Sequence, residues 1–140
     1  MACGIEVPNS DQLVITGGQG DGGGGLSRVQ VYTVGGAKEQ LPDLNQPRRM
    51  HACGYFYNSN NNLVITLFRL YIKYKIIFLV FSQVYLVTGG DHKGQTDRWI
   101  DSTELLTKGA SAWVFSGVLP SVRRGLRAAT LDNKLIVIGI

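Results

Sequence analysis

The sequence is poor in the residues that build a disulfide-rich or a helical protein. Only two of its 140 residues are cysteines, Cys3 and Cys53, whereas a small secreted disulfide framework needs more. We therefore expect both cysteines as small buried apolar residues rather than as a pair, although secretion would let them pair. Long stretches of Ala, Glu, Leu and Lys are also absent. These absences favour an all-β chain over a helical one.

Signals for export and for a particular partner are equally scarce. The start, Met1–Glu6, lacks the basic region and apolar core of a signal peptide, and no Asn-x-Ser/Thr glycosylation site occurs. These absences leave the compartment unknown; the cytoplasm is slightly favoured, and secretion is possible. The net charge of +4 falls to +1 without Arg69, Lys73 and Lys75, which share one unusual segment. We expect no nucleic-acid partner, since a basic footprint is missing.

Glycine is abundant, with 18 residues, and it punctuates short runs of β-branched and aromatic residues. Such runs, bounded by Gly, Pro and Asn clusters, predict strands joined by tight turns. The expected strands are residues 12–18, 28–33, 51–57, 84–90, 99–106, 112–116, 126–131 and 135–138.

The order of these runs repeats along the chain. A strand ending in Gly17-Gly18 is matched by one ending in Gly89-Gly90, and Gly139 begins a third copy 50 positions after Gly89. A period of about 50 residues with four short strands per unit is typical of kelch propeller blades. The repeat therefore predicts incomplete β-propeller architecture, with blades of four antiparallel strands.

The repeated residues resemble the kelch family motif. The resemblance rests on the glycines, on two aromatic residues, and on one arginine in each of two proline-containing connections, residues 41–49 and 119–124. These positions are Gly17, Gly18, Gly89, Gly90, Gly139, Tyr32, Trp113, Arg49 (or Arg48) and Arg124 (or Arg123). The motif departs from the family at Lys38 or Glu39, where Trp is expected, and at Leu105 or Leu106, where Tyr is expected. These matches are structural residues of the family, so they bear on fold more than on ligand.

The resemblance implies a binding scaffold rather than an enzyme. Kelch propellers bind protein partners through loops at one face, as substrate adaptors of ubiquitin ligases or as actin-associated scaffolds. The alternative is an extracellular carbohydrate-active or oxidase-like propeller. No cofactor, metal ligand or catalytic residue is expected, and the residues that contact a partner stay unknown at this stage.

The same register sets the expected organisation. Residues 1–63 and 84–140 are expected to form the partial propeller, with blade boundaries at 1–49, 50–124 and 125–140. Because a propeller needs about 4–8 blades to close, the chain cannot close a ring. We expect Val29, Val31, Leu135 and Val137 to meet water on the outer blade faces, which predicts that the chain alone is not a stable monomer.

Residues 64–83 interrupt the repeat. Leu63–Thr66 has the same sequence as Leu13–Thr16, so an alternative start of the interruption is Leu67. Within Leu67–Phe81 most residues are Phe, Tyr, Ile or Lys, with no Gly, Pro, Asp or Glu. These residue types have A/T-rich codons, so we interpret the segment as the translation of a retained intron outside the blade core. A transcript joining Leu63 to Val84 would establish this. The rival reading, a membrane span, is weak because three basic residues would lie within it.

Three further sets of residues have ordinary explanations. Gly18–Gly23 satisfies G-x-G-x-x-G after a strand, but a strand rather than a helix is expected next, so a phosphate loop is not predicted. His51 and His92 lack Cys or His partners at metal-binding spacing. Asp97, Asp101 and Glu104 are not placed as a catalytic pair.

Overall fold

The computed structural model describes residues 1–56, 62–69, 72–79, 83–93, 97–122, 124–131 and 134–139, and these residues form strands without a helix. The first sheet contains β1 (Cys3–Glu6), β2 (Gln12–Thr16), β3 (Val29–Thr33) and β4 (Lys38–Leu41). The second contains β5 (Ala52–Phe56), β8 (Val84–Thr88), β11 (Ser102–Thr107) and β12 (Val114–Val118). The third contains β13 (Arg127–Leu131), β14 (Lys134–Ile138), β6 (Asn62–Arg69) and β7 (Ile72–Leu79).

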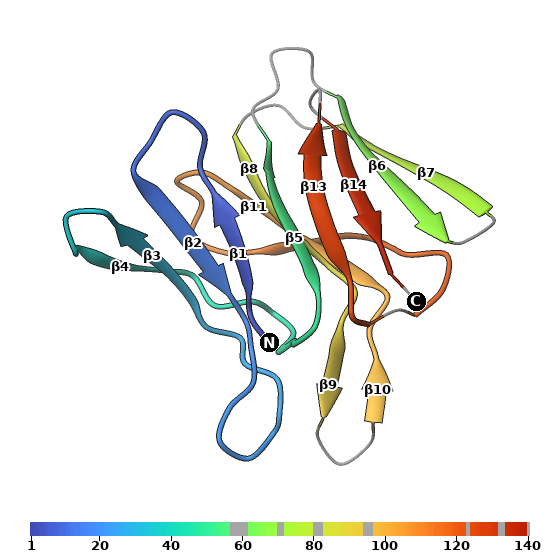
Figure 1. The fold of residues 1–140 in the computed structure, drawn as a ribbon, viewed down its shortest axis with the longest axis horizontal. Coiled ribbons are helices and arrows are strands. Elements are labelled where there is room, and N and C mark those ends of the chain that lie inside the picture. Colours follow the sequence, from blue (N-terminus) through green and yellow to red (C-terminus); the bar gives the residue numbers. More distant parts are fainter. Residues whose placement is uncertain are drawn as a thin grey trace.

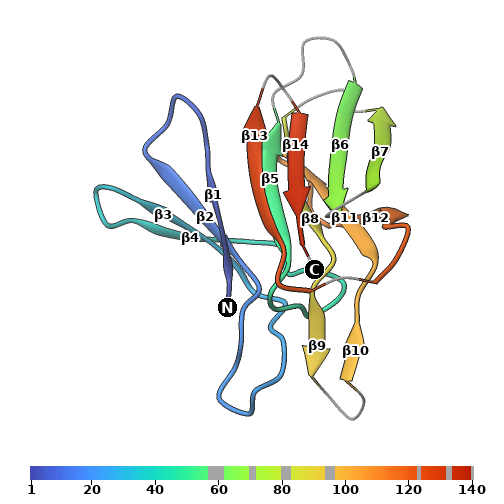
Figure 2. The same ribbon diagram turned by 45° about the vertical axis from the view of Figure 1, so that its right-hand side comes forward.

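The first two sheets follow the chain order and are antiparallel throughout. A separate hairpin of β9 (Asp91–Lys93) and β10 (Asp97–Trp99) extends beyond the second sheet, between β8 and β11. The first strands of the three sheets lie next to one another, with β5 between β1 and β13 (Figure 1). The architecture is therefore a set of four-stranded sheets, antiparallel except for one strand pair in the third, stacked side by side and open at both ends of the set (Figure 2).

Two strands of the second sheet, β5 and β8, are buried on both faces because they consist almost entirely of apolar residues. Every residue of β5 and β8 is buried. Since successive residues of a strand point to opposite faces, Ala52 and Phe56 pack toward the third sheet and Cys53 and Tyr55 toward the first. The continuous apolar run, rather than an alternating one, is the sequence signal for a strand covered on both sides.

Burial corrects one expectation from the sequence. Val29, Val31, Leu135 and Val137 are at most 3 % exposed, so they do not meet water. The two valines of β3 pack in the core between the first and second sheets, and the two residues of β14 pack in the core between the second and third. The terminal sheets turn their apolar faces inward, because that removes the largest apolar area from water.

The interrupting segment has a place in the fold that the sequence did not predict. Its strands β6 and β7 form an antiparallel hairpin that lies outside the second sheet, whose strands β5 and β8 flank it in the chain. However, β6 also pairs with β14, in parallel, and so joins the third sheet. Among the described segments there is no helix with the length and apolar character of a membrane span.

The expected strands agree with the observed ones, with small shifts at their ends. The polar stretch Lys38–Leu41 gives no apolar pattern, and it becomes a strand only by pairing with β3. The strand expected from Trp99 is broken at Ile100 and Asp101, which separate β10 from β11. A strand, β3, does follow the Gly18–Gly23 loop, so the helix that a phosphate loop requires is missing there.

Candidate functional site

The two glycine pairs pack against the connection between the first two sheets, residues 42–51, and we call this region the glycine clamp. Gly17, Gly18, Gly89 and Gly90 all have positive φ, at 58°, 119°, 65° and 101°. A methyl group at Gly17 would press on the carbonyl oxygen of Arg48 and lie 2.8 Å from Cε1 of His51. One at Gly90 would lie 2.6 Å from the carbonyl oxygen of Arg49. Both glycine pairs are therefore needed for close backbone approach as well as for conformation.

Arg48, at the centre of this clamp, has a fully buried side chain. Its guanidinium donates to the carbonyl oxygens of Gly89 and Ser102, at 2.9 and 3.0 Å, and pairs with Glu104 at 2.7 Å. Burial lowers the pKa of Arg48, and the hydrogen bond and charge of Glu104 oppose that shift. The ion pair ties the connection of the first sheet to β11 of the second.

The carboxylate of Glu104 is satisfied from both sides. Besides Arg48, it accepts hydrogen bonds from the backbone N–H groups of Asn45 and Gln46, at 2.7 and 3.1 Å. Glu104 was not expected at any site from the sequence. The available signal was a charged residue directly before the apolar pair Leu105-Leu106, within a strand that the fold buries.

His51 is a second buried polar group at the clamp. Its Nε2 lies 2.8 Å from Oγ1 of Thr16, and Nδ1 is buried with no hydrogen-bond partner among the described residues. Burial, and then the positive charges of Arg48 and the N-terminal amine, lower the pKa of His51 to about 3. The imidazole is therefore neutral at physiological pH and acts as a packing group between the two glycine pairs.

The two aromatic residues of the motif differ in their surroundings. Trp113 is 3 % exposed and donates its indole N–H to the carbonyl oxygen of Pro42 at 2.7 Å, which fixes the end of β12 to the first sheet's connection. Tyr32 is half-buried, hydrogen-bonds Gln30 through its hydroxyl at 3.0 Å, and lies beneath the ammonium of Lys38. Gly139 lies where any added methyl group would meet the side chain of Leu126.

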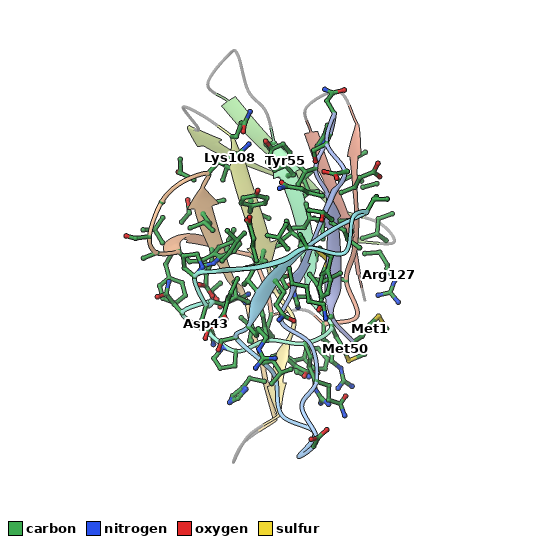
Figure 3. The ribbon with its side chains drawn as sticks, turned by 90° about the vertical axis from the view of Figure 1, so that its left-hand side faces the viewer. Met1, Asp43, Met50, Tyr55, Lys108 and Arg127 are labelled. Carbon is green, nitrogen blue, oxygen red and sulfur yellow. A yellow bond between two sulfur atoms is a disulfide. The ribbon has the colours of Figure 1, made fainter. Side chains whose placement is uncertain are left out.

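The cysteines correct another expectation. Cys3 and Cys53 form a disulfide, with Cα atoms 6.0 Å apart, instead of remaining as separate apolar residues. The bond joins β1 to β5, the adjacent first strands of two sheets. Near it, the main chains of Met1 and Met50 are joined by a 3.1 Å hydrogen bond, and Figure 3 shows these two residues close together.

One end of the molecule carries an exposed charged and aromatic group. The loop after β2 and the β9–β10 hairpin project from this end in both Figure 1 and Figure 2. Arg49 and Arg124 both pair with Asp91, the latter at 3.7 Å. The Arg124 guanidinium lies 4.9 Å from the centre of the Trp99 ring. We call Arg49, Asp91, Trp99 and Arg124 the loop-end cluster.

The side chains of the loop-end cluster differ in their exposure to solvent. Asp91 and Arg49 are 5 % and 14 % exposed at their side chains, whereas Arg124 is 50 % exposed. Trp99 is 44 % exposed, although it is a large apolar side chain. The buried carboxylate therefore anchors Arg49 by a hydrogen bond and attracts Arg124 at longer range, and the side chains of Arg124 and Trp99 remain accessible to solvent.

Two hollows lie away from this end. One, of about 440 Å³, runs across the first strands and is lined by residues of β1, β5 and β13, including Gly4, Cys53 and Ala128. The other, of about 400 Å³, includes Tyr55 and Lys108, which Figure 3 shows together. Neither contains a group of three acidic, histidine or cysteine residues; none occurs in the described part of the chain.

The fold defines the chain as an all-β protein of stacked, mainly antiparallel four-stranded sheets. The sequence matches no protein-family model and no curated protein. Among solved structures, the chain is similar to one described as "Structure of YjhT", with a TM-score of 0.67 and 14 % identity over 98 % of this chain. This chain spans 36 % of the length of that one, and the likeness at this identity concerns the fold alone.

Proposed function

We propose that the chain is part of a kelch-type β-propeller and acts as a non-enzymatic protein-binding module. The observation that carries the binding proposal is the loop-end cluster, where a half-exposed Arg124 lies over the exposed ring of Trp99. The repeated glycine pairs and the chain-ordered sheets support the propeller assignment. Arginine and tryptophan are enriched among residues that dominate protein interfaces.

The cluster favours a partner segment that carries carboxylates. Two guanidiniums share one carboxylate, so the cluster has a net positive charge. An incoming carboxylate would accept from the donors of Arg124 that do not face Asp91, and Trp99 would cover the apolar part of the segment. We propose that the full-length protein uses such binding either as a ubiquitin-ligase substrate adaptor or as an actin-associated scaffold.

The fluorescence of Trp99 provides a direct test. The chain contains two tryptophans, and the other, Trp113, is buried. We expect an Asp/Glu-rich decapeptide to change the tryptophan emission of the full chain, and a Lys-rich decapeptide of equal length to leave it unchanged. Arg124→Ala should weaken the response at least tenfold, and Arg28→Ala, at an exposed position, should not. Equal responses to both peptides would reject the proposed site.

The disulfide favours a second candidate, an extracellular carbohydrate-active or oxidase-like propeller. Disulfides persist mainly in oxidising compartments, and the Cys3–Cys53 bond joins two sheets of the fold. The two candidates differ in the redox state of these cysteines in the producing cell. Before reduction, alkylation of the native protein should label no thiol for the extracellular candidate and two for an intracellular scaffold. After reduction it should label two thiols in either case.

A further inference from the structure

The third sheet is assembled differently from the other two. In the first sheet β2 pairs with β3, and in the second β8 pairs with β11; both pairs are antiparallel. The equivalent strand of the third sheet, β14, pairs instead in parallel with β6. A parallel neighbour cannot come from a simple hairpin. Here it comes from the segment between β5 and β8, two strands of another sheet.

The pairing is regular along the whole of β14. The partners in Cα register are Lys134 with Val64, Leu135 with Ile65, Ile136 with Thr66, Val137 with Leu67, and Ile138 with Phe68. Five consecutive pairs without a register shift mean that the edge of β14 accepts an extended backbone along its full length. We call this edge, the side of Lys134–Ile138 away from β13, the acceptor edge.

The position of the acceptor edge is set without help from β6. Leu135 and Val137 are 1 % and 0 % exposed and belong to the core against the second sheet. Leu135 lies so close to Gly54 of β5 that a methyl group on that glycine would be 2.6 Å from its Cδ1. On the other side, β13 pairs with β14 over five residues. Core packing and β13 therefore hold β14 ready for a strand.

We propose that the acceptor edge is a binding site for an extended polypeptide segment, and that the β6–β7 hairpin occupies it within the same chain. An unpaired edge presents a row of N–H and C=O groups, which select for a strand rather than for any other kind of ligand. The partner is an extended protein segment that pairs through its backbone. The hairpin competes with it, so the apparent affinity depends on the fraction of chains whose hairpin is displaced.

Peptide binding to the full chain and to one hairpin variant tests this proposal. The probe is a synthetic peptide of Asn62–Arg69, which carries the strand sequence of β6. Thr66→Pro should release the hairpin, because β6 is an inner strand with a partner on each side, and proline there removes an N–H group and does not fit an inner strand. We expect this variant to bind the peptide at least tenfold more tightly than the unmodified chain. Thr66→Val, which keeps the N–H group, should bind like the unmodified chain.

N-methylated peptides separate edge pairing from other binding. Alternate N–H groups of a strand point to opposite sides. Methylation of the N–H groups that face the acceptor edge should abolish peptide binding, whereas methylation of the alternate set should leave the affinity unchanged. Buried Trp113 reports whether each variant is folded, since it lies in the core between the first two sheets. Equal binding of both methylated peptides, or no binding to a folded Thr66→Pro chain, would overturn the proposal.

Hydrogen exchange on the unmodified chain tests the same idea if Thr66→Pro does not fold. Saturating peptide should accelerate amide exchange in Val64–Phe68, because the hairpin is displaced. The amides of Leu135–Ile138 should stay protected, because the peptide replaces the hairpin at the same edge. Unchanged exchange in both strands at high peptide concentration would count against displacement. The result does not depend on the loop-end cluster, so it stands or falls separately from the proposed function.

Discussion

The repeated glycines serve two purposes, which a pair of substitutions separates. Gly17 and Gly36 both have positive φ, 58° and 84°, but only Gly17 faces a backbone atom at close range. Gly36→Ala should lose about 1–2 kcal/mol of unfolding free energy, the cost of a left-handed alanine. Gly17→Ala should lose about 2 kcal/mol more, since the methyl group also displaces Arg48 from a packed site. Equal losses in urea unfolding would mean that conformation alone requires the glycine.

Arg48 makes the buried hydrogen bonds and the ion pair with Glu104. The sequence alone did not distinguish it from its neighbour Arg49 as the arginine of the motif. Arg48→Ala removes the partner of Glu104, whose carboxylate is fully buried. We expect a loss of about 3–5 kcal/mol, because an uncompensated charge remains in the interior. Arg28→Ala, at an exposed position, should change unfolding free energy by less than about 0.5 kcal/mol. A small effect of Arg48→Ala in the same urea titration would show that water reaches Glu104.

His51 makes stability depend on acid pH. Its pKa is about 3 in the folded chain and about 6.5 when unfolded. Between these values the unfolded chain binds the proton and the folded chain does not, so the unfolding free energy falls as pH decreases from 6.5 toward 3. The slope is at most about 1.4 kcal/mol per pH unit for this one group.

A matched variant isolates this contribution of His51. His51→Gln keeps an amide near Thr16 and has no titrating group, so its stability should vary less between pH 6.5 and pH 4. Thermal unfolding of both proteins over that range measures the difference. Parallel pH profiles would show that other groups control the acid sensitivity.

At the scale of elements, the disulfide joins two strands that belong to different sheets. Cys3 and Cys53 are 50 residues apart, so the bond restricts the unfolded chain strongly. We expect reduction, or the double change of both cysteines to serine, to lower the unfolding free energy by about 2–4 kcal/mol. Denaturation with and without a dithiol measures this, with the double variant insensitive to the reductant. Equal stability under both conditions would mean that packing alone holds β1 to β5.

The sequence marks the interrupting segment as unusual but does not indicate which strand it pairs with. Its composition sets Leu67–Phe81 apart from the glycine-rich blades, and its origin as a retained intron stays a prediction. Its β-branched and aromatic residues suit strands, but β6 needs β14 as a partner, some 70 residues further along the chain by the register of Val64 with Lys134. Such non-local pairing leaves no local pattern.

For the whole molecule, the buried faces change the expected behaviour of the chain alone. The sequence predicts exposed apolar blade faces and hence no stable monomer, but the residues on which that expectation rests are buried. Two apolar cores share the second sheet, so loss of one should loosen the other. We now expect one cooperative unfolding transition from a monomer. Calorimetry with size-exclusion chromatography at several concentrations tests this, and aggregates or separate transitions would restore the earlier expectation.

The sequence by itself determines the all-β class, most strand positions and the glycine pairs, because these depend on local residue pattern and on a repeat visible along the chain. It also indicates Trp113 as a packing residue and arginine in the connections. Only the tertiary structure decides which arginine is buried, that Cys3 bonds Cys53, that Asp91 gathers two arginines beside Trp99, and that β6 completes the third sheet. Each of these depends on contacts between residues distant in the chain, whose geometry is fixed by how the sheets pack rather than by neighbouring residues.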